Sequence, residues 1–153
     1  MIYLKNGGDG KIENMEKVAN DNAKIFNINN YEYKIVKGNS QSKTTLDVVK
    51  EYFPNGIDLL FIDGDHSYKG IMEDFKNYFP LVNKGGYIVF DDYLPYKLPN
   101  KERDAPKAIN KIVFDNKDKI VDIGLIDDIV NVYQLKNTQN LNGKNMDYII
   151  KKI

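Results

Sequence analysis

Two spacings of hydrophobic residues alternate along the chain. Apolar residues that recur every three to four positions are typical of one side of a helix, whereas short apolar or alternating runs are typical of strands. The first spacing predicts helices over residues 11–27, 44–53 and 68–82, and a fourth that begins at Asp104. The second predicts strands over residues 31–36, 57–62, 87–90, 120–125 and 129–135.

The alternation of helices and strands predicts the class of fold. Helical crossovers between strands favour a parallel sheet with helices on both faces, and the nearly all-apolar run 57–62 suits a strand buried on both sides. We therefore predict one α/β domain over residues 1–136, followed by a polar tail over residues 137–153 with one short apolar patch. At the start of the second helix, Thr44 and Asp47 resemble a capping box.

Composition excludes several classes of function. The 153 residues include 22 basic and 22 acidic side chains, so the formal net charge is zero and nothing indicates a nucleic-acid partner. The absence of Cys excludes a disulfide framework, a thiolate metal site and a cysteine nucleophile. No apolar run approaches the roughly 18 residues that span a bilayer, and the N-terminus lacks the layout of a signal peptide. We therefore expect a cytoplasmic protein without a membrane partner.

Polar residues follow each of the first three predicted strands. Gly38-Asn39-Ser40 follows the first, the segment from Asp63 to Tyr68 follows the second, and Asp91-Asp92-Tyr93 follows the third. Ligands of open parallel sheets bind beyond the carboxyl ends of the strands. These three segments are therefore expected to form one site.

The aspartates of this site predict a metal ion. Asp63 and the pair Asp91-Asp92 directly follow buried strands, so their carboxylates would come close together. Like charges at short range need a cation or a proton to compensate them, and Mg²⁺ prefers oxygen ligands of this kind. A simpler interpretation is that one or two of these aspartates only cap the following turn. Asp65 is expected to be such a turn or helix-capping residue.

His66 is the candidate general base. It is the only histidine of the chain and lies three residues after Asp63, where a group that titrates near neutral pH is useful. A serine triad is not expected, because no Gly-x-Ser-x-Gly sequence is present. Tyr68 and Tyr93 flank the same segments and are weaker candidates for substrate contacts.

Two segments together resemble a known family. Phe61–Gly70 and Leu81–Tyr93 resemble the class I S-adenosylmethionine-dependent methyltransferases. More narrowly, they resemble the group of metal-dependent sugar O-methyltransferases (macrocin O-methyltransferase) and cephalosporin hydroxylase-like proteins. The resemblance implies a Rossmann-like, doubly wound and mostly parallel sheet whose last strand is antiparallel. The match is dense over residues 57–93.

The resemblance also implies roles for the residues of the site. Asp63, Asp91 and Asp92 match the metal-binding carboxylates of that group, and His66 matches its proposed general base. Asn39-Ser40 matches the turn that binds the adenine edge of S-adenosylmethionine, and Asp63 is expected beside the cofactor as well. The implied reaction is O-methylation of a hydroxyl on a small-molecule acceptor, a sugar or another vicinal diol. The metal, expected to be Mg²⁺, lowers the pKa of the hydroxyl, and His66 removes its proton.

The chain departs from the family pattern at its beginning. Class I methyltransferases start with a strand and a Gly-rich turn, and their second strand ends in an acidic residue. Here Ile2–Leu4 is at best a remnant of the second strand, and Lys5-Asn6 stands where the acidic residue is expected. The sheet should therefore lack its first one or two strands and leave an exposed apolar edge beside Asp63. We expect a fragment or a truncated reading frame. The alternatives are a split or decayed gene and a rearranged sheet that a partner chain completes. An incomplete sheet would also favour homo-oligomers.

Two rival functions remain open on the sequence alone. Asp63-Gly64-Asp65 is also the Asp-x-Asp pattern with which glycosyltransferases bind Mn²⁺ and a sugar diphosphate. Alternatively, a truncated methyltransferase-like module without catalytic activity could serve binding or assembly. His66 and the Gly85-Gly86 strand that ends in Asp91-Asp92 favour the methyltransferase over the glycosyltransferase.

Overall fold

The computed structural model describes residues 2–5, 17, 20, 21, 24, 25, 32–93, 104–127 and 146–153. The chain divides into two units, Met1–Tyr52 and Phe53–Ile153. Each unit has a sheet of its own. In the described part of the chain, no helix is both long enough and apolar enough to cross a membrane.

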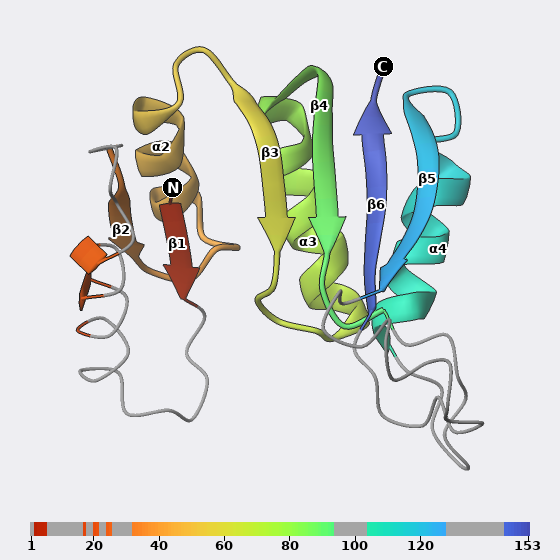
Figure 1. The fold of residues 1–153 in the computed structure, drawn as a ribbon, viewed down its shortest axis with the longest axis horizontal. Coiled ribbons are helices and arrows are strands. Elements are labelled where there is room, and N and C mark those ends of the chain that lie inside the picture. Colours follow the sequence, from red (N-terminus) through yellow and green to blue (C-terminus); the bar gives the residue numbers. More distant parts are fainter. Residues whose placement is uncertain are drawn as a thin grey trace. The chain divides into compact units, whose positions relative to one another are not determined.

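The first unit contains a small parallel sheet and one helix with described bounds. Strand β1 (Ile2–Lys5) pairs in parallel with β2 (Lys34–Lys37), and helix α2 (Lys43–Tyr52) follows β2 (Figure 1). The described residues of the predicted helix 11–27 are helical. The predicted strand 31–36 is confirmed from residue 34 onward. The residues expected to be at best a remnant of a strand, Ile2–Leu4, belong to a paired strand.

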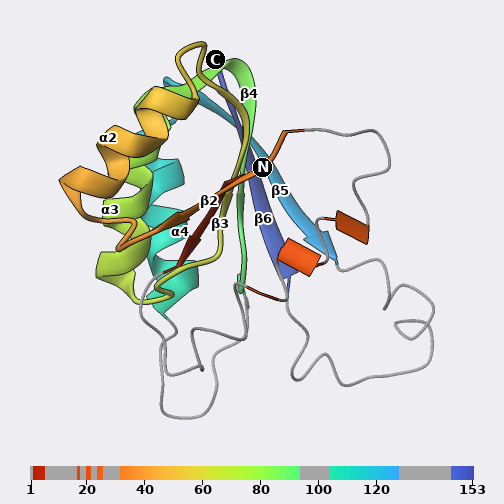
Figure 2. The same cartoon turned by 90° about the vertical axis from the view of Figure 1, so that its left-hand side faces the viewer.

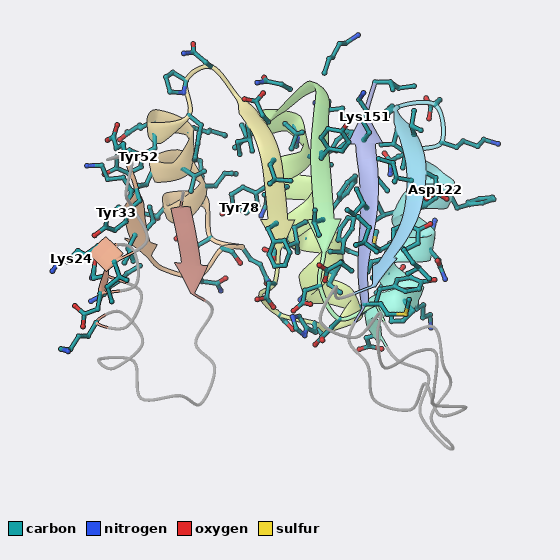
Figure 3. The ribbon with its side chains drawn as sticks, viewed as in Figure 1. Lys24, Tyr33, Tyr52, Tyr78, Asp122 and Lys151 are labelled. Atoms are coloured by element: carbon teal, nitrogen blue, oxygen red, sulfur yellow. The ribbon has the colours of Figure 1, made fainter. Side chains whose placement is uncertain are left out.

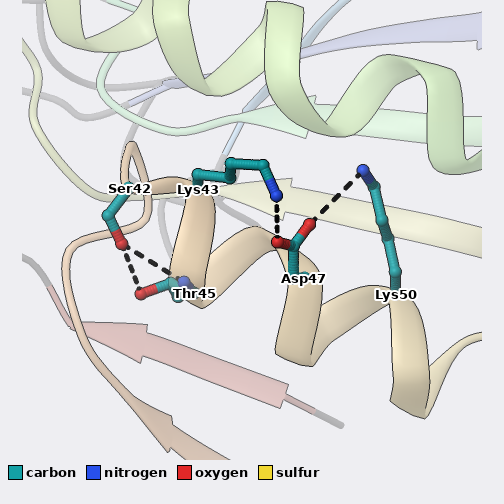
Figure 4. Close-up of polar contacts among 5 residues, drawn as sticks. All are labelled: Ser42, Lys43, Thr45, Asp47 and Lys50. Carbon is teal, nitrogen blue, oxygen red and sulfur yellow. Dashed lines mark hydrogen bonds and ion pairs between the residues drawn. The ribbon is translucent and has the colours of Figure 1, made fainter.

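The start of α2 differs from the prediction. Ser42 precedes the helix, and its hydroxyl accepts a hydrogen bond from the backbone N–H of Thr45 (3.2 Å), as an N-cap does (Figure 4). The carboxylate of Asp47 instead contacts Lys43 Nζ at 2.5 Å, one turn away on the helix surface. The capping box predicted from Thr44 and Asp47 is therefore wrong, because the helix already begins at Lys43 and Ser42 takes the N-cap position.

The second unit is a mixed sheet with helices. Its elements are β3 (Ile57–Ile62), α3 (Tyr68–Tyr78), the 3₁₀ helix η1 (Phe79–Leu81), β4 (Val82–Phe90), α4 (Asp104–Asp115), β5 (Ile120–Asp127) and β6 (Met146–Lys152). The strand order is β3-β4-β6-β5, in which β3 and β4 are parallel and β6 is antiparallel to both β4 and β5. The α/β class and the antiparallel last strand of the expected fold are confirmed.

One face of this sheet carries the hydrophobic core. Helices α3 and α4 both pack on this face (Figure 2). The largest fully buried side chains come from the two central strands and from α4, namely Ile88, Phe90, Ile109, Ile112 and Ile150. Full burial of each such side chain stabilises the fold by roughly 1.5–3 kcal/mol. The core therefore holds β4 and β6 firmly under the two helices.

The other face of the sheet is apolar and exposed. Successive side chains of a strand point to opposite faces, and Leu59 and Phe61, which alternate with the core residues of β3, are 63% and 52% exposed. Within the described residues, both helices of this unit cover the same face, and β3 pairs only with β4. The prediction of helices on both faces is therefore not met here. The expected apolar edge at β3 is confirmed.

The C-terminal strand corrects a second prediction. The strand predicted over 129–135 lies outside the described residues, whereas residues 146–152, predicted to belong to a polar tail, form β6 between β4 and β5. Ile150 is fully buried, and Lys152 donates hydrogen bonds to the carbonyls of Phe79 (3.1 Å) and Val82 (2.8 Å). The apolar patch at residues 148–150 is too short to predict a strand from the sequence. The strand is stabilised by its pairing with β4 and β5 on either side.

Candidate active site

The candidate site lies at the carboxyl ends of β3 and β4. These strands are parallel with Ile62 opposite Phe90, and the backbone N–H of Asp91 donates to the carbonyl of Ile62 (3.1 Å). This hydrogen bond continues the pairing by one residue beyond β4. It places Asp63 and Asp91, the first residues after their strands, side by side as expected.

The loop from Asp63 to α3 is held by its own polar side chains. Ser67 is the N-cap of α3, and its hydroxyl accepts from the N–H of Gly70 (3.0 Å). Asp65 accepts from the N–H of Ser67 (3.0 Å), which confirms it as a turn residue. A Cβ at Gly70 would lie 2.4 Å from the carbonyl oxygen of Asp65, so only glycine lets the loop approach the helix this closely. The loop between Asp63 and α3 therefore packs closely against the first turn of the helix.

Asp63 and Asp91 form the acidic part of the site. One ligand atom each from Asp63, His66 and Asp91 lies within 4.8 Å of the others. Partial burial raises the pKa of the Asp63 carboxyl to about 6, and the hydrogen bond and charge of Asp91 contribute to this rise, while His66 opposes it. A carboxylate whose ionisation is disfavoured by a neighbouring carboxylate is suited to a cation that both could share. The donor set therefore fits a hard divalent metal ion.

His66 lies between two carboxylates. Its Nε2 is 3.1 Å from Oδ1 of Asp63, and its Nδ1 is 2.6 Å from Oδ2 of Asp92. The imidazole is 35% exposed, so it is open to a small molecule from one side. The single histidine thus joins the ends of both strands, at the position expected of a general base.

Asp92 takes a different partner from Asp91. Its carboxylate contacts His66, and it does not belong to the group of ligand atoms formed by Asp63, His66 and Asp91. Its backbone has a φ of 59°, and it is the only non-glycine with positive φ among the described residues. Such strained conformations often occur at functional sites. The role of Asp92 as a third metal ligand stays a prediction.

The two tyrosines that flank the site differ in their surroundings. The hydroxyl of Tyr93 donates to the side chain of Asn110 on α4 (3.0 Å), and its ring packs against that of Tyr148 on β6 at 4.8 Å. Tyr68 begins α3, and Lys107 Nζ lies 5.8 Å from the centre of its ring. Tyr93 therefore fastens the end of β4 to its neighbours, and a substrate contact by either tyrosine stays a prediction.

Tyr148 supports this site and was not among the residues predicted for it. Its hydroxyl donates to Asp122 on β5 (2.7 Å), and the backbone N–H of Tyr93 donates to the carbonyl of Met146 (2.8 Å). Figure 3 shows Asp122 on β5 beside β6, which carries Lys151. Residues 146–148 therefore hold the segment after Asp92 in place. No sequence signal indicated this, because the strand is flanked by polar residues.

Asn39 and Ser40 lie in the first unit, in the turn between β2 and α2. The side-chain oxygen of Asn39 accepts from the N–H of Gln41 (2.9 Å), and its carbonyl accepts from the N–H of Ser42 (2.9 Å). Ser40 is buried. The turn follows the carboxyl end of a parallel strand, as a cofactor-binding turn does, and its contact with adenine stays a prediction.

One curated protein is similar in sequence to this chain. An uncharacterized protein of Acanthamoeba polyphaga mimivirus is 42% identical over 106 residues, and these cover 69% of this chain and 44% of that protein. The chain thus spans less than half the length of this curated relative.

Two solved structures share the fold. One is an rRNA methylase from Streptococcus thermophilus, with a TM-score of 0.60 and 8% identity over 99% of this chain and 72% of that one. The other is CalS11, a TDP-rhamnose 3'-O-methyltransferase of calicheamicin biosynthesis, with a TM-score of 0.55 and 14% identity over 96% of this chain and 56% of that one. At such identities the likeness concerns the fold alone.

The family assignment comes from the sequence of the chain itself. A family model described as a methyltransferase domain matches residues 6–93, which is more than half of the 153 residues. The match includes the turn after β2, the loop after β3 and the residues after β4. The chain therefore belongs to this family of methyltransferase domains.

Proposed function

We propose that this chain carries the catalytic residues of an S-adenosylmethionine-dependent O-methyltransferase that acts on a hydroxyl of a sugar or another vicinal diol, with a divalent metal ion. The observation that carries the proposal is the meeting of Asp63, His66 and Asp91 at the ends of two parallel strands. The family of methyltransferase domains supports the reaction. The fold shared with a TDP-rhamnose 3'-O-methyltransferase supports a sugar as acceptor.

Asp63 and Asp91 are the residues that would hold the metal ion, with Mg²⁺ as the best fit to carboxylate oxygens. Once bound, a divalent cation supplies the positive charge that lowers the pKa of an acceptor hydroxyl. The raised pKa of Asp63 supports this assignment, because its cause includes a neighbouring carboxylate that a cation would neutralise. Asp65, which is engaged by the N–H of Ser67, is not part of this set.

His66 would accept the proton of the acceptor hydroxyl. Its ring lies among the proposed metal ligands and is partly exposed, so an acceptor could reach it. Positioned general bases contribute about 10²–10⁴-fold to a rate. The deprotonated oxygen is then the nucleophile, and holding it in line with the methyl group supplies further acceleration.

S-adenosylmethionine supplies the methyl group. In this chain, Asn39 and Ser40 would contact its adenine edge, from a turn at the carboxyl end of a parallel strand.

Calorimetry on the full chain tests the proposal. S-adenosylhomocysteine should bind, and a sugar nucleotide should bind only with Mg²⁺ and with S-adenosylhomocysteine present. Binding of a sugar nucleotide with Mn²⁺ alone would favour the glycosyltransferase, and no binding of either would favour a non-catalytic module.

A pair of variants tests the general base in a methyl-transfer assay. His66→Ala should lower turnover by about 10²–10⁴-fold and leave Mg²⁺ binding in place. The matched control is Asp118→Asn, an exposed position after α4 and away from the strand ends, which should behave as the wild type. Unchanged turnover in His66→Ala would contradict the role of His66.

A further inference from the structure

We propose that Asn39 is a specificity-determining residue that recognises the adenine base as a hydrogen-bond donor. Its side-chain amide N–H would donate to N1 or N7, the ring nitrogens on either side of the 6-amino group, and would not accept from the amino group itself. The inference deepens the proposed function. It rests on that function for S-adenosylmethionine as the cofactor and for the turn after β2 as the contact with adenine.

The orientation of the Asn39 side chain is set by the turn in which it lies. Its Oδ1 accepts a hydrogen bond from the backbone N–H of Gln41 (2.9 Å), a bond that asparagine often makes in turns. A backbone N–H only donates, so the atom that faces Gln41 is the side-chain oxygen and not the nitrogen. Asn39 is exposed, so a ligand can reach the two N–H donors on Nδ2. The oxygen is thus engaged within the turn, and the nitrogen is the atom better suited to a ligand.

Further contacts hold this turn in one conformation. The carbonyl of Asn39 accepts from the N–H of Ser42 (2.9 Å), and the hydroxyl of Ser42 donates to Oγ1 of Thr45 (2.9 Å; Figure 4). Thr45 is buried, and a Cβ at Gly38 would lie 2.3 Å from its Oγ1, so Thr45 packs directly against the beginning of the turn. A turn that is ordered before binding loses little conformational entropy when a ligand binds. It also presents the Asn39 amide in a fixed direction.

The donors and acceptors of adenine make the two possible roles of Asn39 distinguishable. N1 and N7 accept hydrogen bonds, whereas the 6-amino group donates them. Donation from Nδ2 therefore requires a ring nitrogen, and acceptance by the second lone pair of Oδ1 requires the amino group. Asn39→Asp keeps the shape of the side chain, and one carboxylate oxygen can still accept from the N–H of Gln41. The other oxygen replaces Nδ2, so the variant exchanges a donor for an acceptor.

Calorimetry on the full chain with S-adenosylhomocysteine and three analogues tests the proposal. The analogues replace N1 or N7 by C–H, or lack the 6-amino group. In the wild type, one of the two deaza analogues should bind about tenfold more weakly than S-adenosylhomocysteine, because the Nδ2 donor then faces a C–H group. In Asn39→Ala and Asn39→Asp this ratio of Kd values should fall to below about threefold.

The analogue without the amino group supplies the opposite comparison. Its Kd relative to S-adenosylhomocysteine should rise by about tenfold from the wild type to Asn39→Asp, because the new acceptor then loses its partner. Asn55→Asp is the matched control, since it makes the same exchange at an exposed position beyond the other end of α2 and should leave every ratio unchanged. Each ratio compares two ligands on one variant, so a fraction of unfolded chain does not affect it.

The inference and the proposed function fail in different ways. A wild type that binds S-adenosylhomocysteine, but whose penalty for the deaza analogues is the same in Asn39→Ala, would keep the proposed function and overturn the role of Asn39. A penalty for loss of the amino group that disappears in Asn39→Ala would show that Asn39 is an acceptor, and would overturn the role as well. A wild type that binds neither S-adenosylhomocysteine nor any analogue would overturn the proposed function, and the inference with it.

Discussion

Asp63 and Asp91 directly follow two adjacent parallel strands. The effect of this arrangement is seen in the pKa of Asp63. Burial and the neighbouring carboxylate raise the pKa of Asp63 from 3.8 to about 6, while the contact with His66 acts in the opposite direction. The ionisation of Asp63 at neutral pH therefore comes at some cost to stability. Such a cost is common where a protein binds a cation, because binding removes it.

Asp63→Asn should stabilise the chain in a pH-dependent way. Between pH 3.8 and about 6 the folded state holds the Asp63 proton more tightly than the unfolded chain, so the free energy of unfolding falls as the pH rises through this window. The variant lacks this decrease. It should gain about 1 kcal/mol over the wild type at pH 7.5, a value reduced for solvent screening of a half-exposed group, and nothing at pH 3.5.

Urea unfolding at both pH values checks this expectation. Asp118→Asn is the control and should show no pH-dependent difference from the wild type. Addition of Mg²⁺ at pH 7.5 should stabilise the wild type but not Asp63→Asn. Parallel pH profiles of wild type and Asp63→Asn would contradict the argument.

The strained backbone at Asp92 leads to a second expectation. Asp92→Gly and Asp92→Ala both remove the carboxylate that contacts His66, so that loss cancels when they are compared. Glycine adopts a φ of 59° freely, whereas alanine does not. The glycine variant should therefore be more stable by about 1 kcal/mol in denaturant unfolding. Equal stabilities would show that the segment after β4 rearranges in these variants.

At the scale of elements, strand β6, which no sequence pattern predicted, is hydrogen-bonded to the segment that follows α3. Lys152 on β6 donates to the carbonyls of Phe79 and Val82, which lie in and just after η1. Carbonyls at the end of a helix have no partner within it. The contact thus connects the last strand of the chain to the helix that begins beside the candidate site.

Lys152→Met should destabilise the chain by about 1–3 kcal/mol, because the carbonyls it satisfies are partly buried. Lys151→Met is the matched control. Lys151 is the neighbouring residue on β6, its side chain points to the opposite face, and its Nζ lies 5.4 Å from the ring centre of Tyr87. The control should cost less than about 1 kcal/mol. Thermal unfolding of both variants makes the comparison, and equal losses would refute the role of Lys152.

At the scale of the whole molecule, the second unit ends in a sheet edge that is expected to associate. Within the described residues, β3 has a partner on one side only, and Leu59 and Phe61 are exposed on the uncovered face. Unpaired edges with apolar side chains promote pairing with other chains.

Leu59→Lys should therefore reduce association of the purified chain. Sedimentation velocity over a range of concentrations should show fewer oligomers than in the wild type, because a charge on an edge strand opposes strand pairing. Phe114→Lys is the control, since Phe114 on α4 is 72% exposed but lies away from the edge. Equal changes in both variants would mean that the general polarity of the surface, and not the edge, controls association.

The part that the sequence could predict follows local chemistry. The apolar run of β3, the turn residue Asp65 and the acidic residues after β3 and β4 depend on residues close together in the chain. Parallel strands end at one edge, so the meeting of Asp63, His66 and Asp91 also followed from the order of elements. Hence the fold class, the family and the location of the candidate site were accessible from the sequence.

Tertiary contacts decided the remaining features. Residues 146–152 become a strand only because β4 and β5 flank them, and their own pattern is too short and polar to show it. The partner of Asp92 depends on a left-handed turn and on a histidine that arrives from another strand end. The sequence by itself therefore determined which groups gather at the strand ends. Which partner each aspartate contacts, Asp63 for Asp91 and His66 for Asp92, was decided by the tertiary structure. The reason is that these contacts join the ends of two strands that are far apart in the sequence, and a local sequence pattern does not contain that information.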